Sequence, residues 1–400
     1  RSRPAGLTLR ELRAEIERLP RGEFEKKFGP RAFYEKTAFI YPRDTLGLRF
    51  LQREALKPGV LEFGPEGCFA LDLRDETRAA DWRKRHGLAE EDYICVVPRL
   101  RYTPYYRMKN LPRSAGDYEI DALNDASAAQ DHAALRDLIV RWVRGTGARV
   151  VACPEMTYQI ATAKEQLIDP LPDDVRKRVV WRDTFWLPDE AAALYAKARA
   201  VISAECHSPI IALAAGTPIL HVRNPVDTIK GQMFADIGLS DWLFESTEAT
   251  GTQLWAALKS IHDDLPRARA RVRDVMAKVA GIQRGMTEAI LATGITERAH
   301  LETSDKLEQL AARVEGLRRL SLDPALMHAL LQHRAAGAQT PAARSSSVSS
   351  PAGHSRGSHG HGLGVGQGVG RGGVLGGPLR GLALLLPLPR PPLRTKKKQQ

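Results

Sequence analysis

The 400-residue chain lacks the signatures of several protein classes. It has only four cysteines, at positions 68, 95, 153 and 206, and no two of them have the spacing of a metal site. We therefore expect no metal and no disulfide framework, with mostly structural thiols in a reducing compartment. No run of 18 apolar residues occurs, so we predict no transmembrane helix and a location in the cytoplasm or at the membrane periphery.

Two further features that the sequence lacks argue against particular classes of function. No Gly-x-Gly-x-x-Gly motif follows a strand-like segment, which argues against a dinucleotide-binding protein. The net charge is +12, but part of it collects in the C-terminal tail, and no basic face with interleaved aromatic residues is present. We therefore expect no nucleic-acid partner, whereas anionic small substrates suit the charge. The chain begins RSRPAG without an apolar leader, and we interpret it as a fragment.

The segment from Arg199 to Glu245 organises the chain. An apolar run at 200–203 predicts a buried strand, and a tight turn at 204–207 follows it. Ser208 and Pro209 are typical of a helix start, and Gly216 is typical of a helix end. A second apolar run at 218–222 predicts another strand. This strand–helix–strand order is the unit of a parallel α/β sheet.

The same alternation extends over residues 93–222 and predicts a Rossmann-like domain. Between the first strand and the first helix we expect a long loop at 103–127, of a length that is often functional. The predicted strands cover residues 93–98, 149–153, 178–183, 200–203 and 218–222, and the predicted helices cover 128–144, 156–167, 188–198 and 208–215.

The flanking regions complete a four-part organisation. Before residue 90 we expect helices at 7–19, 46–56 and 75–86, a strand at 37–41 and an extended segment at 59–73. After residue 250 we expect helices at 252–262, 265–293 and 301–320. A Gly/Ser-rich tail follows and is expected to be disordered. The parts are a partial N-terminal α/β lobe (1–90), a Rossmann-like lobe with the active site (91–250), C-terminal helices (251–334) and the tail (335–400).

Polar residues gather where the predicted strands end. Glu205, His207, Arg223 and Lys230 should lie near the carboxyl edge of the sheet, where such folds bind ligands. A helix N-terminus at Ser208 would present free N–H groups to an anion. An imidazole beside an anion pocket suits acid–base chemistry. The alternative is a surface turn with an incidental histidine.

The segment ECHSPIIALAAGTP resembles the polysaccharide pyruvyl transferase family. That family carries a strand, a Ser-x-Arg-Leu-His turn and a small-residue helix ending in Gly-x-Pro. Ser203, His207 and the 216–218 segment match this pattern, whereas Glu205 stands where the family has arginine. IYPRDTLGLRFL, with Arg43 and Asp44, looks like the family's Arg-Asp-x-x-Ser turn. FALDL and YICVVPRLR look like two further family segments.

The resemblance implies an α/β fold of two Rossmann-like lobes of GT-B type, with an incomplete N-terminal lobe. It also implies transfer of pyruvate from phosphoenolpyruvate to a sugar of a cell-surface polysaccharide as a ketal. We expect no cofactor, and phosphoenolpyruvate and a saccharide acceptor as partners. The acceptor sugar, the linkage and the oligomeric state stay open. Two alternatives also stay open: a GT-B glycosyltransferase with a nucleotide-sugar donor, and a degenerate domain that binds glycans without catalysis.

A mechanistic hypothesis assigns roles to the candidate residues. His207 is the expected general acid or base, and Glu205 would orient it or assist deprotonation of the acceptor. Arginines at a strand end can hold a phosphate or carboxylate bidentately. The expected substrate-binding residues are Arg99, Arg101, Ser208, Arg223, Lys230 and Asp44.

Overall fold

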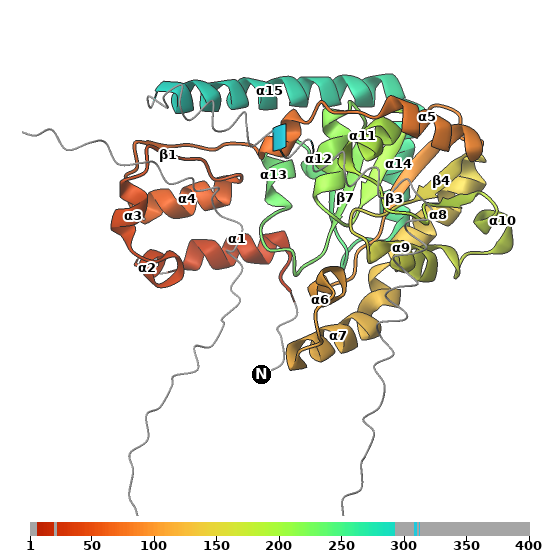
Figure 1. Ribbon diagram of the computed structural model, residues 1–400, viewed down its shortest axis with the longest axis horizontal. Helices are drawn as coiled ribbons and strands as arrows, with labels where there is room; N and C mark the ends of the chain where they lie inside the picture. Colours follow the sequence, from red (N-terminus) through yellow and green to blue (C-terminus); the bar gives the residue numbers. More distant parts are fainter. Residues whose placement is uncertain (1–5, 20–21, 293–307, 310–311, 313–400) are drawn as a thin grey trace, which may run out of the picture. The chain divides into compact units, whose positions relative to one another are not determined.

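A computed structural model describes residues 6–19, 22–292, 308, 309 and 312. Its main feature is a six-stranded parallel sheet in the order β5-β4-β3-β6-β7-β8 (Figure 1). The order reverses between β3 and β6, as in doubly wound α/β folds. The strands are β3 (Tyr93–Val97), β4 (Arg149–Ala152), β5 (Val179–Trp181), β6 (Ala200–Ser203), β7 (Ile219–Arg223) and β8 (Leu243–Glu245).

The central strands form because their apolar runs are covered on both faces. Every residue of β3, β6 and β7 is buried. In the register of the sheet, Ile94 of β3 lies beside Val150 of β4 and Ala200 of β6. Continuous apolar runs of this kind are typical of parallel strands between two helical layers. The five strands expected between residues 93 and 222 are all present, and the predicted α/β class with a parallel sheet is confirmed.

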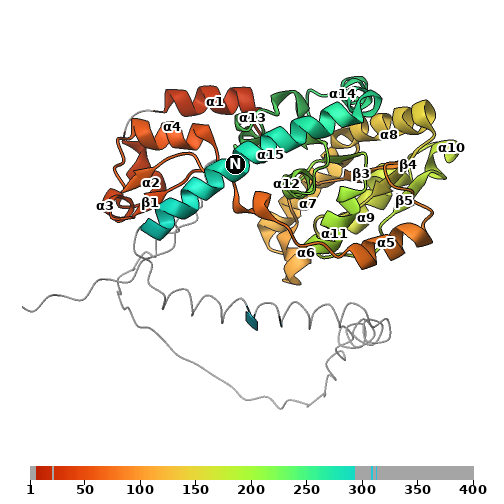
Figure 2. The same ribbon diagram turned by 90° about the horizontal axis from the view of Figure 1, so that it is seen from above.

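Helices cover both faces of the sheet. Helix α11 packs against α5 and α12, and α8 packs against α14. Figure 2 shows these two groups on opposite sides of the strands. The helices and turns around the sheet are α5 (Glu76–Arg85), α8 (Ala133–Thr146), α9 (Gln159–Thr162) with a π-helical turn (Ala163–Ile168), α10 (Asp173–Arg176), α11 (Pro188–Ala196), α12 (His207–Ala214), α13 (Gln232–Asp236), a 3₁₀ turn (Ser240–Trp242), α14 (Gly251–Asp263) and α15 (Leu265–Ala292).

The N-terminal part has a hydrophobic core of its own. Leu12, Phe24 and Phe50 belong to it, and Ile229 joins it from beyond β7. Phe69 and Trp82, which lie within the predicted N-terminal lobe (1–90), instead pack into the core of the large sheet. The elements of this part are α1 (Leu9–Arg18), α2 (Glu23–Phe28), α3 (Arg31–Glu35), α4 (Thr45–Arg53), the two-stranded parallel pair β1 (Phe39–Ile40) and β2 (Val60–Leu61), and the 3₁₀ turn η1 (Gly67–Ala70).

The prediction of a long loop at 103–127 is wrong. This segment contains α6 (Tyr105–Lys109) and most of α7 (Ala115–Asp131), which begins with a capping box at Ser114. The side of α7 that faces inward is polar and includes Asp121 and Asn124. A helix whose buried face is polar has no apolar periodicity, which is why the sequence pattern missed it.

The C-terminal helices agree with the expectation up to Ala292. Helix α14 begins with a capping box at Thr250, and α15 buries one row of apolar residues. In the described part of the chain, no helix combines the length and apolar character that a membrane span needs. The helix predicted at 301–320 and the tail predicted from 335 lie outside the described residues, apart from 308, 309 and 312.

Candidate active site

The site lies at the carboxyl edge of the large sheet, beside its switch point. The strands that follow β3 extend the sheet to one side, and those that follow β6 extend it to the other. Open α/β sheets bind ligands at this place because the connections after the two central strands leave it in opposite directions. Arg99 follows β3, Glu155 follows β4, and the turn 204–206 follows β6, so these segments meet at one edge.

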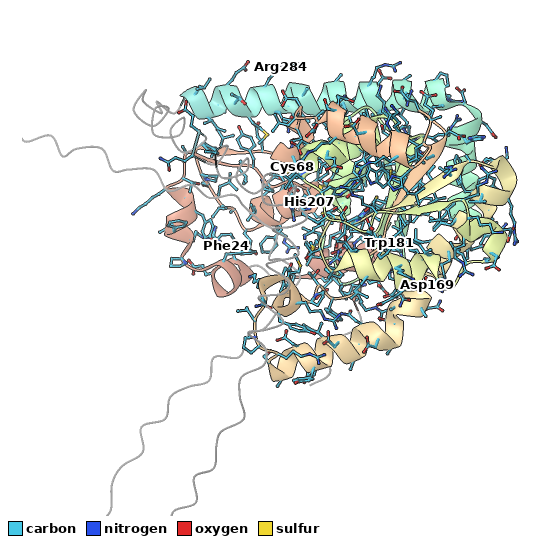
Figure 3. The ribbon with its side chains drawn as sticks, turned by 45° about the vertical axis from the view of Figure 1, so that its right-hand side comes forward. Phe24, Cys68, Asp169, Trp181, His207 and Arg284 are labelled. Atoms are coloured by element: carbon cyan, nitrogen blue, oxygen red, sulfur yellow. The ribbon has the colours of Figure 1, made fainter. Side chains whose placement is uncertain are left out.

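His207 is the first residue of α12, and a carboxylate lies against each of its ring nitrogens. Nε2 lies 3.1 Å from Glu66 Oε1, and Nδ1 lies 3.3 Å from Glu155 Oε1. Hydrogen bonds with Cys206, Glu155 and Glu66 raise the pKa of His207 far above its ordinary value. Because its side chain is 38% exposed, solvent reaches a protonated imidazole. Figure 3 labels His207 and Cys68; Cys68 belongs to η1, the turn that packs against α12.

Glu66 is one of the two carboxylates beside His207 that the sequence analysis did not assign to the site. It lies just before η1 and accepts a hydrogen bond from Arg43 Nη1 at 2.9 Å. Burial opposes ionisation, but the hydrogen bond with His207 and the charge of Arg43 lower the pKa of Glu66 below its ordinary value. Gln283 of α15 donates to the Glu66 carbonyl oxygen at 3.0 Å. The only sequence signal for this link was Arg43, in the turn that resembles the family motif.

Glu155 occupies the N-terminus of α12. Its Oε2 accepts the Ser208 N–H at 2.7 Å, while Oε1 faces His207. The helix starts at His207 rather than at Ser208, so the predicted capping role of Ser208 is wrong. The Ser208 hydroxyl instead accepts a buried hydrogen bond from Tyr195. The anion site predicted at this helix start does hold a negative group, the protein's own carboxylate, as the helix dipole favours.

Arg99 and Glu205 lie together in a buried pair. The Arg99 guanidinium forms an ion pair with Asp227, and its Nε lies 3.5 Å from Glu205 Oε1. Gln159 Nε2 donates to the same Glu205 oxygen at 2.8 Å. Burial raises the pKa of Glu205 to about 8, although the charge of Arg99 opposes the rise. Glu205 contacts Arg99 and not His207, so the structure does not give it the predicted orienting position.

Lys230 supplies a second cation near the turn. Its charge acts on Glu205 and Cys206, where it opposes the rise of their pKa values. The side chain is half-buried. Within the ranges that the structure describes, its ammonium group has no hydrogen-bond or ion-pair partner. Lys230 is therefore open to an added anion, whereas Arg99 already has one.

Three predicted substrate-binding residues lie outside this cluster. Arg101 forms a bidentate ion pair with Asp131, at 3.0 and 2.6 Å. Asp44 is the buried N-cap of α4. Arg223 was expected just past a strand at the edge, but it ends β7 and is fully buried, with its Nη1 2.7 Å from Glu245. Its other N–H groups reach backbone carbonyl oxygens, so all five donors are used inside the protein.

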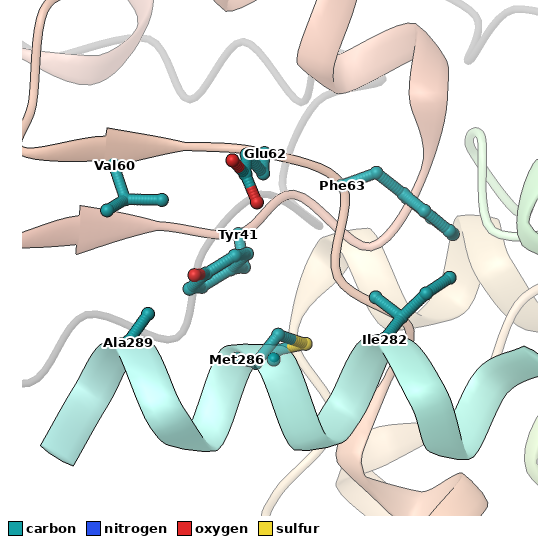
Figure 4. Close-up of a pocket in the computed structure, with 8 residues that line it drawn as sticks. Tyr41, Val60, Glu62, Phe63, Ile282, Met286 and Ala289 are labelled. Atoms are coloured by element: carbon teal, nitrogen blue, oxygen red, sulfur yellow. The ribbon is translucent and has the colours of Figure 1, made fainter. Parts of the chain in front are cut away.

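A cavity of about 480 Å³ lies away from these residues. Figure 4 shows it between β2 and α15, with Tyr41, Phe63 and Met286 in its lining. Its lining is largely apolar, and Glu62 contributes the one carboxylate. None of the predicted site residues lines this cavity, so we assign it no substrate.

The fold and the site together define the class of protein. The protein is an α/β protein whose parallel sheet carries, at its switch-point edge, a histidine between two glutamates, with Arg99 and Lys230 nearby. This arrangement suits proton transfer to or from an anionic substrate. Among the described residues, no group of three or more His, Cys, Asp or Glu side chains could hold a metal ion.

The family follows from comparison with known sequences. Residues 30–225 match the family model of polysaccharide pyruvyl transferase, and this part of the chain belongs to that family. The family consists of transferases that modify polysaccharides. The resemblance indicated by the motifs around His207 and Arg43 is therefore confirmed. A search of curated proteins gives no match to the chain.

Two solved structures are similar to parts of the chain. One is Anabaena Alr3699/HepE in complex with UDP, with 12% identity, a TM-score of 0.41 and coverage of 71% of this chain and 77% of that one. The other is the glycosyltransferase VinC in complex with dTDP, with 18% identity and a TM-score of 0.29. That match covers 52% of this chain and 43% of VinC. Neither similarity is close enough to transfer a ligand to this protein.

Proposed function

We propose that this protein transfers pyruvate from phosphoenolpyruvate to a saccharide, forming a ketal. One observation carries the proposal: the histidine of the family-like turn lies between Glu66 and Glu155, which keep it protonated while part of its ring stays exposed. Protonation of the donor's methylene carbon needs a general acid, and a charged imidazole can serve as one. The proposal includes no cofactor, a GT-B-type arrangement of two lobes, and a location in the cytoplasm or at the membrane periphery.

Cations at the strand ends would hold the donor. Phosphoenolpyruvate carries a phosphate and a carboxylate, so it needs several positive groups. Lys230 is available for one of them. Arg99 would receive the other in exchange for Asp227, whose second carboxylate oxygen is buried without a hydrogen bond. Glu205, which touches Arg99, then acts as a positioning residue and not as the base of the earlier hypothesis.

The proposed reaction balances in atoms and charge. His207 gives its proton to the methylene carbon, which becomes the methyl group of the ketal. One sugar hydroxyl attacks the adjacent carbon, the bond from that carbon to the phosphate oxygen breaks, and a second hydroxyl forms the other C–O bond. One hydroxyl proton restores His207, and the other leaves with the phosphate. Glu66 and Glu155 hold the imidazole in place before the transfer, and the N–H that gives up its proton leaves its carboxylate in that step.

Calorimetry and phosphate release test this function with the full chain. We expect phosphoenolpyruvate to bind, and phosphate to be released when a saccharide acceptor is added. His207→Gln should keep donor binding and lower turnover by about 100-fold or more, the usual contribution of a general acid. His86→Gln, a change at the C-cap of α5 and outside the residues assigned to the site, is the matched control and should leave turnover unchanged.

Other outcomes would point to the alternatives. Turnover of His207→Gln at the parental rate would refute the role of this histidine. Binding of UDP- or GDP-sugars in place of phosphoenolpyruvate would identify a glycosyltransferase. Binding of a glycan without either donor would identify a non-catalytic domain.

A further inference from the structure

Exposed apolar side chains concentrate in one short segment. Ten large hydrophobic residues are exposed in the described part of the chain, and half of them lie between residues 105 and 123. They are Tyr105, Met108, Leu111, Tyr118 and Leu123. Within the stretch 105–114, every residue except Tyr106 is exposed. Scattered exposed hydrophobic residues need no explanation, but a concentration of this kind marks an interaction surface.

The segment is held firmly, so its exposure does not come from loose packing. Asp121 of α7 is buried and receives hydrogen bonds from Tyr106, Arg107 and Arg113. At its base, the backbone of Tyr102 exchanges two hydrogen bonds with the side chain of Asn124, each of 2.8 Å. Figure 1 shows α6 and α7 extending away from the strands. We call residues 105–114 the α6 tip.

The α6 tip is basic as well as apolar. It contains Arg107, Lys109 and Arg113 and has no acidic residue. Arg107 and Arg113 pair with Asp121 of α7, but their side chains stay 49% and 39% exposed. Lys109 Nζ lies 5.7 Å from the centre of the Tyr105 ring. Arg113 Cζ lies 4.5 Å from the centre of the Tyr118 ring. Tyrosine rings with basic neighbours are typical of the membrane–water interface, where the ring sits at headgroup level and the cation meets lipid phosphates.

We propose that the α6 tip docks on the surface of a membrane that contains anionic lipids. Met108 and Leu111 would enter the boundary between headgroups and acyl chains. Lys109 would contact the headgroups, together with the exposed parts of Arg107 and Arg113 that do not face Asp121. A glycan is a poorer partner because these aliphatic side chains offer it neither a stacking face nor a hydrogen bond. A second copy of the chain is also a poorer partner, because a two-fold contact would bring like charges together. The proposal does not depend on pyruvyl transfer.

Vesicle co-sedimentation of the full chain tests the proposal. The vesicles contain either equal parts of phosphatidylglycerol and phosphatidylcholine or phosphatidylcholine alone. We expect binding to the anionic vesicles that weakens as salt rises. Met108→Ser/Leu111→Ser should weaken it by about tenfold or more. Lys109→Gln should weaken it by about fivefold, the usual effect of one basic residue near such a surface.

Matched substitutions elsewhere keep the test specific. Leu73→Ser removes a hydrophobic side chain that is 65% exposed, and Lys84→Gln removes an exposed cation of α5. Both should bind vesicles as the parent does, and circular dichroism should show that all variants fold. Equal binding by parent and α6-tip variants would overturn the proposal, since another part of the chain would then bind the lipid. No preference for anionic vesicles would also overturn it. The proposal would also be overturned if the parent protein formed dimers or bound glycans through the same residues and did not bind lipid.

Discussion

The charge of His207 depends on two neighbouring carboxylates, and removing one of them gives the sharpest test of the site. In Glu155→Gln, the amide oxygen can still accept the Ser208 N–H, so α12 keeps its first hydrogen bond. The negative charge 3.3 Å from His207 Nδ1 is lost. Since a carboxylate favours the protonated imidazole, the pKa of His207 should fall.

The structure gives the size of this effect. Two unit charges 3.3 Å apart interact by about 5 kcal/mol at an effective dielectric constant near 20 and by about 1 kcal/mol in water. Because the imidazole is 38% exposed, solvent screening brings the value toward the lower limit, about 1–3 kcal/mol. This corresponds to a fall of about 1–2 pKa units. Glu66 remains in place, so His207 should stay more basic than a free histidine.

Nuclear magnetic resonance of the imidazole nitrogens measures the change directly. The His207 signals are assigned by comparison with His207→Gln, and the titration is repeated in Glu155→Gln. Glu165→Gln removes an exposed carboxylate from the π-helical turn after α9 and serves as the control. A neutral His207 at pH 7 in the parent, or an unchanged pKa in Glu155→Gln, would refute the reasoning.

The same groups set a pH window for stability. The folded-state pKa of His207 is raised, so its stabilising effect is complete below about pH 6.5 and is lost as the pH rises through the folded-state value. The folded-state pKa of Glu66 is lowered, so its effect is present above about pH 4.3 and is lost as the pH falls through the folded-state value. The pair therefore stabilises the fold most between these two limits.

Three further predictions concern buried charges. Arg223→Met leaves Glu245 without its ion-pair partner and should lower the free energy of unfolding by about 3–5 kcal/mol in urea titration. A loss below about 1 kcal/mol, on the order of an exposed pair, would contradict the buried role. Burial raises the pKa of Glu205 to about 8, so stability should fall as the pH rises from about 4.3 to about 8. Glu205→Gln should flatten that fall in thermal unfolding, and an unchanged slope would count against it. Asp44→Ala should cost about 1 kcal/mol through loss of the α4 cap, whereas Asp44→Asn, which can still accept the bond, should cost less in the same assay.

Sequence patterns predicted the sheet because its strands are short apolar runs separated by clear turn residues. The run at 93–97 and the helix end at Gly216 are local signals that survive in the structure. Patterns failed where the buried side of an element is polar, as in α7. They also failed at Arg223, since a cation at a strand end looks available until its acceptors are found on Leu7, Thr228 and Glu245.

The candidate site, too, depends partly on local sequence and partly on tertiary structure. The sequence by itself determined that a histidine would follow a central strand at the start of a helix, since β6, the turn and α12 are continuous in the chain. Only the tertiary structure decided its electrostatics, because Glu155 lies 52 residues and Glu66 lies 141 residues away along the chain. Coulomb interactions depend on distance in space, and no local pattern records which distant carboxylates the fold brings to one ring.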